Sequence, residues 1–476
     1  MRQVLSVTSE CIPLVKTGGL ADVAGALPGA MRDVGWEMKT LLPGYPEVMA
    51  KIKAGKTVLS DKNLFGGAAK VVEASGSGLK LFVLVAPHLY ERDGLPYGDA
   101  SGKDWPDNPE RFAALCKMAA RIGSEGAGDW LPDIVHCHDW QAGLTPLYLS
   151  QSSGHRPGTI MTIHNIAFHG FAPKEKIGLL GLPRDGFTQD GYEYWDQISA
   201  LKAGLVWSDK LTTVSPTYAK ELMRAEFGMG LDGLLQSRSN DLVGILNGID
   251  DKTWDPATDP EIANYKTPRG KRTAKTRLRR EFGLPVSDGP LCVVVSRLSH
   301  QKGLDLLLEA LPALVDRGGQ LALLGSGDKE LERRFAEAAA SHKFVSARIG
   351  YDEALSHRMI AGADAILVPS RFEPCGLTQL YGLRYGTVPV VAYTGGLVDT
   401  VIPVSPMTLR GKVATGIQFH PATSDALARA LMQAVDLFAD KPVWEMLQKN
   451  GMRQTVGWQA SAAEYASLYE KVAPAL

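Results

Sequence analysis

Cysteine is scarce in this chain of 476 residues, and long apolar runs are absent. The five cysteines lie far apart and form no Cys-x-x-Cys motif, so we expect neither a disulfide framework nor a structural zinc site. No apolar run approaches the roughly 20 residues that span a bilayer, so membrane insertion is not expected. The N-terminal residues MRQVLSVTSE lead almost at once into a strand-like run, without the pattern of a signal or transit peptide. We therefore predict a cytoplasmic protein.

Charge of one sign is not in excess either. The chain has 51 Lys and Arg residues against 52 Asp and Glu residues, a formal net charge of −1. A near-neutral chain has no long-range field that attracts a polyanion, so nucleic acid is not expected as a partner. The hydrophobic and charged fractions, 45% and 22%, are ordinary for a globular protein. The length is too great for one core, so two domains are expected.

A complete dinucleotide-binding fingerprint is also missing. Leu324-Gly325-Ser326-Gly327 begins like one, but Glu330 stands at the position of the third glycine. The fingerprint needs that glycine for close packing of the helix against the strand. An NAD-type oxidoreductase is therefore not favoured, and no cofactor is expected.

What the chain does have is a regular alternation of short apolar runs with helical patterns. The runs predict strands at residues 4–9, 79–87, 133–139, 159–165, 211–215 and 242–246, and then at 291–296, 320–324, 345–350, 365–368, 388–392 and 416–419. This alternation predicts an α/β fold of parallel sheets with helices on both faces. Asn247-Gly248-Ile249-Asp250 is turn chemistry near mid-chain, and residues 251–268 resemble a linker. An amphipathic helix is expected after Trp458.

The stretch around Glu373 is where the chemistry concentrates. An apolar run at 365–368 leads into Glu373-Pro374, and Gly376 then precedes a helical pattern. A helix start has unpaired N–H groups and a partial positive charge, which suit an anionic ligand. A second loop, Thr394-Gly395-Gly396, is expected to offer further free backbone N–H groups. We predict a site for a phosphorylated, polyhydroxylated ligand; the alternative is an ordinary crossover with a surface glutamate.

Other side chains that bind ligands or transfer protons follow the same rule of placement. They occur at the carboxyl ends of predicted strands, which is the edge where open parallel sheets bind their ligands. These residues are Lys16, His138, Asp139, His164, Asn165, Arg297, Lys302, Gly325, Gly327, Tyr351 and Glu373.

Each of these signals has a plainer alternative. Arg297 and Lys302 together suit a diphosphate, or they are surface cations at a helix start. His164 suits a sugar hydroxyl, or it is a structural histidine. In the run His136-Cys137-His138-Asp139 the two histidines share one face of a strand and Asp139 does not, so a metal is not expected.

Three further features also leave two interpretations open. Four aromatic residues either stack on sugar rings or pack in the core: Tyr90, Tyr97, Trp105 and Trp140. The seven cations between Arg269 and Arg280 form either a solvated helix face or a regulatory anion site. Cys375 is either reactive or a small, partly buried apolar residue.

Taken in order, eight segments resemble those of the bacterial glycogen synthases and plant starch synthases: KTGGLADVAGALP, HCHDW, TIHNIAFHG, SPTYAKEL, NGID, SRLSHQKG, PSRFEPCGLTQLYGLRYG and TGGLVDTV. The resemblance spans almost the whole chain. It implies the GT-B fold, in which two Rossmann-like parallel-sheet domains face each other across a cleft. It also implies retaining transfer of glucose from ADP-glucose to the non-reducing end of an α-1,4-glucan, which elongates glycogen and releases ADP. The lack of a plant-type N-terminal extension favours the bacterial enzymes.

The resemblance also implies domain boundaries and residue roles. The acceptor-side domain would comprise residues 1–244 and a C-terminal helix at 459–476, and the donor-nucleotide domain residues 245–458. Glu373 matches the essential acid and acts with His164, Arg297 and Lys302, of which the last two hold the diphosphate. The other substrate-binding positions are Lys16, Gly18, Gly19, Asp22, Asp139, Asn165, Asn247, Tyr351, Cys375, Gly376, Leu377 and Thr378. No metal or cofactor is implied.

One departure and two rival functions accompany this resemblance. Many related retaining transferases have a second glutamate where this chain has Tyr381, so the ribose contact of that glutamate has no equivalent here. The rivals are a transferase that uses UDP-glucose or another acceptor, and an inert glucan-binding protein, which the intact candidate set argues against. Glu373 is the single well-placed carboxylate, so we expect same-face attack assisted by the leaving phosphate and not a double displacement. The number of subunits is left open.

Overall fold

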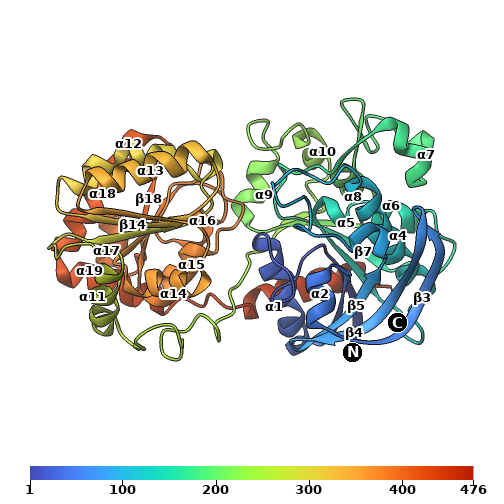
Figure 1. Ribbon diagram of the computed structural model, residues 1–476, viewed down its shortest axis with the longest axis horizontal. Coiled ribbons are helices and arrows are strands. Elements are labelled where there is room, and N and C mark those ends of the chain that lie inside the picture. The colour runs from blue at the N-terminus through green and yellow to red at the C-terminus, as the bar shows by residue number, and fades with distance from the viewer. Residues whose placement is uncertain (475–476) are drawn as a thin grey trace. The chain divides into compact units, whose positions relative to one another are not determined.

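The computed structural model describes residues 1–474, which fold into two compact units. Unit 1 comprises Met1–Val214, Ala219–Gly248 and the chain from Trp458 onward, and unit 2 comprises Ser215–Tyr218 and Ile249–Gly457. Each unit is a sheet with helices on its faces, as the labels of Figure 1 show. The α/β class expected from the alternating sequence pattern is confirmed. No helix in residues 1–474 has the length and apolar character needed to cross a membrane.

Unit 1 is built on a nine-stranded sheet. Its strands, in spatial order, are β12 (Leu242–Gly244), β11 (Lys210–Thr213), β7 (Gly158–Ile163), β6 (Ile134–His138), β1 (Arg2–Val7), β2 (Trp36–Pro43), β5 (Leu79–Val85), β4 (Gly67–Gly76) and β3 (Lys53–Leu64). Its main helices are α1 (Gly19–Asp33), α4 (Asn108–Glu125), α5 (Asp139–Ala142), α6 (Thr145–Ser150), α8 (Ala200–Trp207) and α20 (Gln459–Val472). A separate small sheet has the order β8 (Phe171–Pro173), β10 (Gln197–Ser199), β9 (Glu193–Tyr194).

The expectation of an entirely parallel sheet is wrong for one edge of unit 1. Strands β3 and β4 are antiparallel to each other, and β4 is antiparallel to β5. The turn between β3 and β4 has positive φ at Phe65 (51°) and Gly66 (93°), which is the backbone that a two-residue hairpin needs. Strand β3 is mostly exposed, so it lacks the continuous apolar run by which buried parallel strands are recognised.

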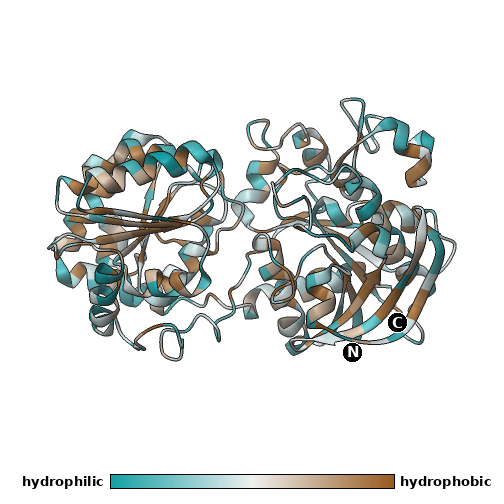
Figure 2. Cartoon of the chain, viewed as in Figure 1, coloured by the Kyte–Doolittle hydropathy of each residue, from teal (hydrophilic) through white to brown (hydrophobic). Residues whose placement is uncertain are grey.

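Unit 2 has a six-stranded, fully parallel sheet with order β15 (Val345–Ile349), β14 (Gln320–Gly325), β13 (Leu291–Val295), β16 (Ala365–Val368), β17 (Val388–Ala392), β18 (Ile417–Phe419). Alternate residues of the four central strands, β14, β13, β16 and β17, enter two different cores, whereas the edge strands β15 and β18 contribute to one of them. One core lies under α12 (Leu304–Val315), α13 (Lys329–Ser341) and α18 (Ser424–Ala439), and the other under α11 (Lys271–Glu281), α14 (Glu353–Gly362) and α15 (Thr378–Tyr385). Figure 2 accordingly shows the strands of this sheet as hydrophobic along most of their length.

The C-terminal helix α20 belongs to the core of unit 1. Trp458, Tyr465 and Tyr469 pack with residues of α1, β1 and β2, and the Tyr469 hydroxyl lies 2.8 Å from His136 Nδ1. An amphipathic helix at the chain end therefore buries its apolar stripe against a strand and a helix from the beginning of the sequence.

The segment 251–268 is not a linker, contrary to the prediction. The ring of Trp254 stacks between His357 and Tyr381, with centroids 3.7 and 3.8 Å away. Asp259 is 1% exposed and accepts hydrogen bonds from His357 Nδ1 (2.8 Å) and the Tyr385 hydroxyl (2.5 Å). The polar, proline-containing composition of this segment is typical of a linker. Its few aromatic and acidic side chains, however, have partners that are far away in the sequence.

The solvated-face interpretation of the basic run fails for three of its seven cations. Lys271 is buried and donates to Ala361 O, Tyr385 O and Thr387 Oγ1 at 2.7–2.9 Å. Lys275 Nζ lies 2.6 Å from Asp364 Oδ2, and Arg279 donates to Gln320 and Ser287. Side chains at these positions stabilise unit 2, while the other four cations of the run are exposed.

Replacing Asp259 with Asn should destabilise unit 2. The substitution removes two charge-assisted bonds and leaves polar partners buried, which costs about 2–4 kcal/mol. Burial acts to raise the pKa of Asp259, but the bonds from His357 and Tyr385 outweigh it and the pKa is lowered. The charged form therefore stabilises the fold above the ordinary pKa of an aspartate, about 4.

Urea unfolding of both proteins between pH 3 and pH 8 measures this effect. The deficit of the D259N variant should be full above about pH 5 and should shrink as the pH falls below about 4. Asp288→Asn, at an exposed position of the same unit, is the matched control. Equal midpoints for wild type and D259N at pH 7 would show that the buried carboxylate is not needed.

Candidate functional site

In each unit several of the predicted site residues lie at the place where the strand order reverses. In unit 2 the neighbours β13 and β16 lead into helices on opposite faces of the sheet, and in unit 1 β1 and β6 do the same. The loops that follow two such strands run to opposite faces of the sheet and leave a crevice between them. Doubly wound folds bind their ligands in this crevice. Lys302 follows β13, Glu373 follows β16, the Lys16 loop follows β1, and Asp139 follows β6.

The two loops of unit 2 are held together by close backbone contacts. Gly303 has φ +65°, and a Cβ there would lie 2.0 Å from the carbonyl oxygen of Pro369, so only glycine fits. Arg371 N–H donates to Gln301 O at 2.9 Å, and the Arg371 guanidinium makes two bonds of 2.7 and 2.6 Å to Asp305. The SRLSHQKG loop and the PSRFEP turn therefore form one structural block.

This block places Lys302 against Glu373. Glu373 is 6% exposed, and its Oε2 accepts hydrogen bonds from Lys302 Nζ (2.5 Å) and Ser370 Oγ (2.9 Å). A carboxylate this buried requires such partners, because an unpaired buried polar group is costly. The structure thus brings together two of the four predicted catalytic residues, and the surface-glutamate alternative is wrong.

The turn after Glu373 has the geometry expected of an anion-binding helix start. Gly376 has φ +70°, Leu377 is the N-cap of α15 and makes no side-chain cap, and Thr378 is the first helical residue. Cys375 is 6% exposed, which fits the small apolar residue. Gln379, which the sequence did not single out, donates to Cys375 O and Gly376 O and so supports the turn.

The loop at Thr394 does not present all of its N–H groups, contrary to the expectation. Gly396 N–H donates to Glu373 O and Pro374 O at 3.1 and 3.2 Å. A Cβ on Gly395 would lie 2.0 Å from Glu373 O, and one on Gly396 2.3 Å from Cys375 O. The two glycines are needed for this close approach, through which the loop supports the backbone of the Glu373 turn.

A related arrangement in unit 1 depends on Glu10, a residue that the sequence analysis missed. Its carboxylate is buried (3% exposed) and accepts hydrogen bonds from Thr17 N–H, Thr17 Oγ1 and Gly18 N–H at 2.5–3.1 Å. The Tyr97 hydroxyl donates to it as well, at 2.6 Å. Two backbone N–H groups of the Lys16 loop are therefore bonded to Glu10, which fixes the conformation of the loop.

The front of this loop remains open. Lys16 Nζ lies 2.9 Å from Asp22 Oδ1, and both side chains are partly exposed. A Cβ at Gly18 or Gly19 would meet no atom within 4 Å, so a ligand can approach the backbone at the start of α1. The structure brings these four predicted residues together.

Asp139, His164 and Asn165 form a second cluster at the same sheet edge. Asp139 has a positive φ of 54°, a strained conformation for a residue with a side chain. Its Oδ1 accepts the N–H groups of His164 (2.7 Å) and Asn165 (3.3 Å). Burial raises the pKa of Asp139 to about 7, although these two bonds act to lower it. Its side chain therefore joins the end of β6 to the end of β7.

His164 is a neutral imidazole at pH 7 and not a cation. Burial, with a smaller contribution from His138, lowers its pKa well below the ordinary value. Its Nε2 lies 3.0 Å from His138 Nδ1, and His138 Nε2 lies 3.2 Å from Ser6 Oγ. Both ring nitrogens of His138 are thus engaged within the protein. Residues 1–474 contain no group of three or more potential metal ligands.

Three further predicted residues lie outside the hydrogen-bonded groups described above. Arg297 is exposed, and Tyr351 is 72% exposed with its hydroxyl bonded to Glu353. Asn247 is 7% exposed, and within the described chain its Oδ1 accepts no hydrogen bond. Buried amide oxygens are seldom left in this state, so this atom suits a ligand donor.

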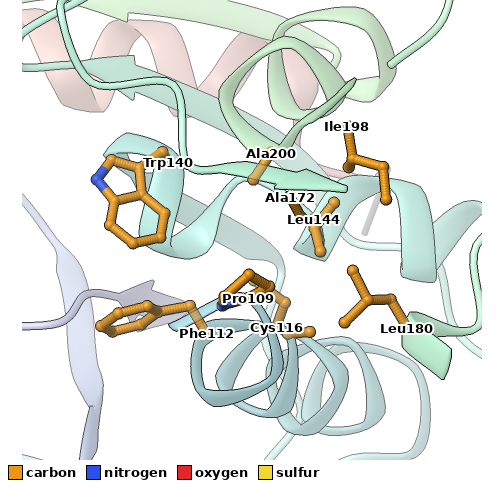
Figure 3. Close-up of a pocket in the computed structure, with 11 residues that line it drawn as sticks. Pro109, Phe112, Cys116, Trp140, Leu144, Ala172, Leu180, Ile198 and Ala200 are labelled. Atoms are coloured by element: carbon orange, nitrogen blue, oxygen red, sulfur yellow. The ribbon is translucent and has the colours of Figure 1, made fainter. Parts of the chain in front are cut away.

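The aromatic residues proposed for sugar stacking pack within unit 1. Tyr90 is 1% exposed. Trp140 lies edge-on to Phe112 at 4.9 Å and lines a small apolar pocket with Leu144, Leu180 and Ile198, shown in Figure 3. The pocket has a volume of about 10 Å³, which is room for one water molecule at most. It does not accommodate a sugar.

Tyr381 confirms the departure noted in the sequence. It is 9% exposed, belongs to the core of unit 2 and stacks on Trp254. An aromatic ring packed in this way supplies no carboxylate to a ligand.

Comparison with known proteins agrees with this geometry. A family model described as the starch synthase catalytic domain matches residues 3–237, and one for glycosyl transferases group 1 matches residues 275–451. A glycogen synthase of Paracoccus denitrificans (strain Pd 1222) is 57% identical over 473 residues, which cover 99% of this chain and 100% of that protein. A glycogen synthase of Rhodopseudomonas palustris (strain BisA53) is 54% identical over 475 residues, covering 99% and 97%.

Solved structures give the same result. The catalytic domain of Starch Synthase IV from Arabidopsis thaliana bound to ADP and acarbose superposes with a TM-score of 0.89 at 31% identity, covering 99% of both chains. A sucrose-phosphate synthase from Thermosynechococcus elongatus, at 20% identity and a TM-score of 0.62, shares the fold alone. These likenesses confirm the GT-B fold expected from the sequence.

Substituting Glu10 with Gln should loosen the Lys16 loop. The change replaces a carboxylate that faces several donors, and charge-assisted bonds of this kind contribute about 1.5–3 kcal/mol. Hydrogen exchange of the Thr17 and Gly18 amides should become about 10- to 100-fold faster. The control is Glu91→Gln at an exposed position. Unchanged exchange in the E10Q variant would mean that another group holds the loop.

Asp139→Asn should change how stability depends on pH. Asn keeps an oxygen acceptor for the two N–H groups but does not titrate. A carboxyl whose folded pKa is raised from 3.8 to about 7 contributes stability below pH 4 and loses it as the pH rises to about 7. Wild type should therefore lose up to about 1.4 kcal/mol per pH unit relative to D139N in this window.

Thermal midpoints of both proteins at pH 4, 5, 6, 7 and 8 provide the measurement, with the exposed Asp129→Asn as control. Parallel curves for wild type and D139N would contradict the raised pKa.

Proposed function

Because the chain belongs to the starch and glycogen synthase family of glycosyltransferases, we propose that it elongates glycogen. It transfers glucose from ADP-glucose to the non-reducing end of an α-1,4-glucan with retention of configuration, and it releases ADP. Relatives named glycogen synthase that match along the full chain support this activity. A cytoplasmic location is part of the proposal.

The observation that carries the proposal is the Lys302–Glu373 pair beside the uncapped start of α15. A buried carboxylate, a cation 2.5 Å away and a helix start are together suited to a donor with a diphosphate and a sugar that becomes cationic. Arg297 lies on the same loop as Lys302 and is exposed, so it is available to an incoming diphosphate. We assign both cations to this group.

The sugar and the acceptor are assigned to residues of unit 1. Lys16, Gly18, Gly19 and Asp22 form an open loop at the start of α1, which suits a phosphate or a sugar hydroxyl. Neutral His164 can donate one hydrogen bond to a hydroxyl without bringing a charge next to the cation-like glucose. The roles of Asp139, Asn165, Asn247, Tyr351 and residues 375–378 follow the family resemblance.

The chemistry we propose is attack by a glucan 4-hydroxyl on the face from which ADP departs. The glucosyl–oxygen bond to the diphosphate breaks as the new glycosidic bond forms, and the hydroxyl proton passes to the leaving phosphate. Lys302 and Arg297 lower the barrier because negative charge grows on the diphosphate as it leaves. Glu373 positions the donor and stabilises the positive charge of the glucose.

A release assay tests the donor, the acceptor and the role of Glu373 together. Wild-type protein with glycogen should release ADP from ADP-glucose much faster than UDP from UDP-glucose. Glu373→Gln should lower kcat at least about 100-fold with a small change in KM for ADP-glucose, because the charge acts mainly in the transition state. Glu309→Gln, an exposed glutamate of α12, is the matched control.

Three results would count against parts of this proposal. Faster turnover with UDP-glucose would reassign the donor. Full activity of E373Q would remove its catalytic role. A covalent glucosyl–Glu373 species detected by mass spectrometry would replace the same-face reaction with a double displacement.

A further inference from the structure

Exposed aromatic rings gather on the small sheet β8–β10–β9 of unit 1. Phe171 at the start of β8 is 43% exposed, and Trp195, between β9 and β10, is 80% exposed. Tyr194, at the end of β9, lies between them, with ring centroids 5.5 Å from Phe171 and 6.5 Å from Trp195. We call Phe171, Tyr194 and Trp195 the aromatic platform. No residue of it was singled out from the sequence.

Two rings of the platform, those of Phe171 and Tyr194, are held in place by neighbouring residues. His169 is 5% exposed and stacks on Phe171 with an interplanar angle of 17° at 4.7 Å. The Tyr194 hydroxyl donates to the carbonyl oxygen of Met229 at 2.6 Å. Phe171 and Tyr194 are nearly parallel, at 28°. Trp195 stands edge-on to Tyr194, with an interplanar angle of 85°. The contacts of Phe171 and Tyr194 order these two rings without a ligand, and the ring of Trp195 lies exposed beside them.

The residues of the turn that carries Trp195 are not those that would make this turn most stable. Trp195 and Asp196 have φ values of 49° and 61°, a left-handed backbone that Asn and Gly adopt at least cost in two-residue hairpins. The turn is held instead by Asp196, which donates its N–H to Glu193 Oε1 (2.7 Å) and pairs with Lys174 Nζ at 2.6 and 2.8 Å. A strained residue with a large exposed ring is a mark of function.

The chemistry of the surface fits a sugar chain. Pyranose rings have apolar C–H faces that stack on aromatic rings and hydroxyls at their rims that bond to polar groups. Lys174, Glu193 and Asp196 place both donors and acceptors beside the platform. The core of a protein–protein interface is poor in charged residues, so charges at this position favour a polyhydroxylated occupant over a second copy of the chain.

The platform is also close in sequence to the sugar-side residues. Strand β8 begins six residues after Asn165, a distance of at most about 20 Å along the chain. Leu201 N–H donates to His169 O at 3.0 Å, and Ala200 N–H to Gly170 O at 3.3 Å, so the start of α8 supports the connecting segment. A long acceptor that has its end near Asn165 can extend over this part of unit 1.

We propose that the aromatic platform is an accessory binding site for the α-glucan chain. The identity of the glucan rests on the function proposed above. The platform stacks glucose residues of the chain that are remote from the reacting end, and Lys174 and Asp196 bond to their hydroxyls. It raises affinity for long acceptors more than for short ones, because a short acceptor does not reach it.

Binding to glycogen without any donor tests the site separately from the reaction. In native gels containing glycogen, Trp195→Ala should raise the apparent dissociation constant about tenfold, the effect of losing one stacked ring. Trp195→Tyr should restore most of the affinity, since a flat ring returns. Met407→Ala, which removes a 74% exposed apolar side chain from unit 2, should bind like wild type.

Kinetics provide the second measurement. The ratio of KM for glycogen to KM for maltotriose should rise about tenfold in W195A and return in W195Y. Unchanged retention of W195A in the glycogen gel, or an equal loss in M407A, would overturn the proposal. So would a concentration-dependent dimer in wild type that W195A abolishes, as light scattering detects, because the face would then bind a second copy.

The outcomes also separate this inference from the proposed function. Donor-free binding that depends on Trp195, in a protein that does not turn over ADP-glucose, would uphold the platform and reject the activity. If the protein turns over ADP-glucose and its binding to glycogen does not depend on Trp195, the proposed activity is upheld and the platform is rejected.

Discussion

The ion pair between Lys302 and Glu373 is the contact on which the candidate site of unit 2 depends. The two residues are 71 positions apart, so no local pattern brings them together. They meet because β13 and β16 are adjacent, because Gly303 allows the backbone to touch Pro369, and because Arg371 binds Asp305. The order of the strands, the glycine at position 303 and the ion pair between Arg371 and Asp305 therefore together hold the buried carboxylate of Glu373.

The two units support similar sequences by different means. Thr-Gly-Gly-Leu-x-Asp occurs at Thr17 and again at Thr394. In unit 1 the loop N–H groups bind the side chain of Glu10, whereas in unit 2 Gly396 binds the backbone of the Glu373 turn. In both cases the loop is ordered before any ligand arrives. Groups that are already in position need no reorganisation during a reaction.

Binding and chemistry are assigned to different parts of the scaffold. The charged and proton-bearing groups lie at the carboxyl edges of the two large sheets, where helix starts and strand ends meet. The exposed rings lie on a separate sheet of three short strands, held by His169 and Met229. A polymer-elongating enzyme has use for both, because the reacting end and the rest of the chain make different demands on the protein.

The sequence by itself determined the α/β class and most of the candidate residues. Strands such as LCVVV and AILV are buried on both faces, so their composition alone identifies them. Turn residues then mark the strand ends, and reactive side chains there are recognisable by type and by family motif. Glu373, Lys302 and Asp139 could be named in this way.

Only the tertiary structure decided what those residues touch. Glu10 has no motif, and it became visible because Thr17, Gly18 and Tyr97 converge on it. The 251–268 segment has the composition of a linker, yet Trp254 and Asp259 are buried by partners about 100 residues away. Trp140 and Trp195 are equally aromatic in the sequence, but one packs inside unit 1 and the other faces solvent. Such outcomes depend on long-range contacts, and these arise only once the sheets have assembled.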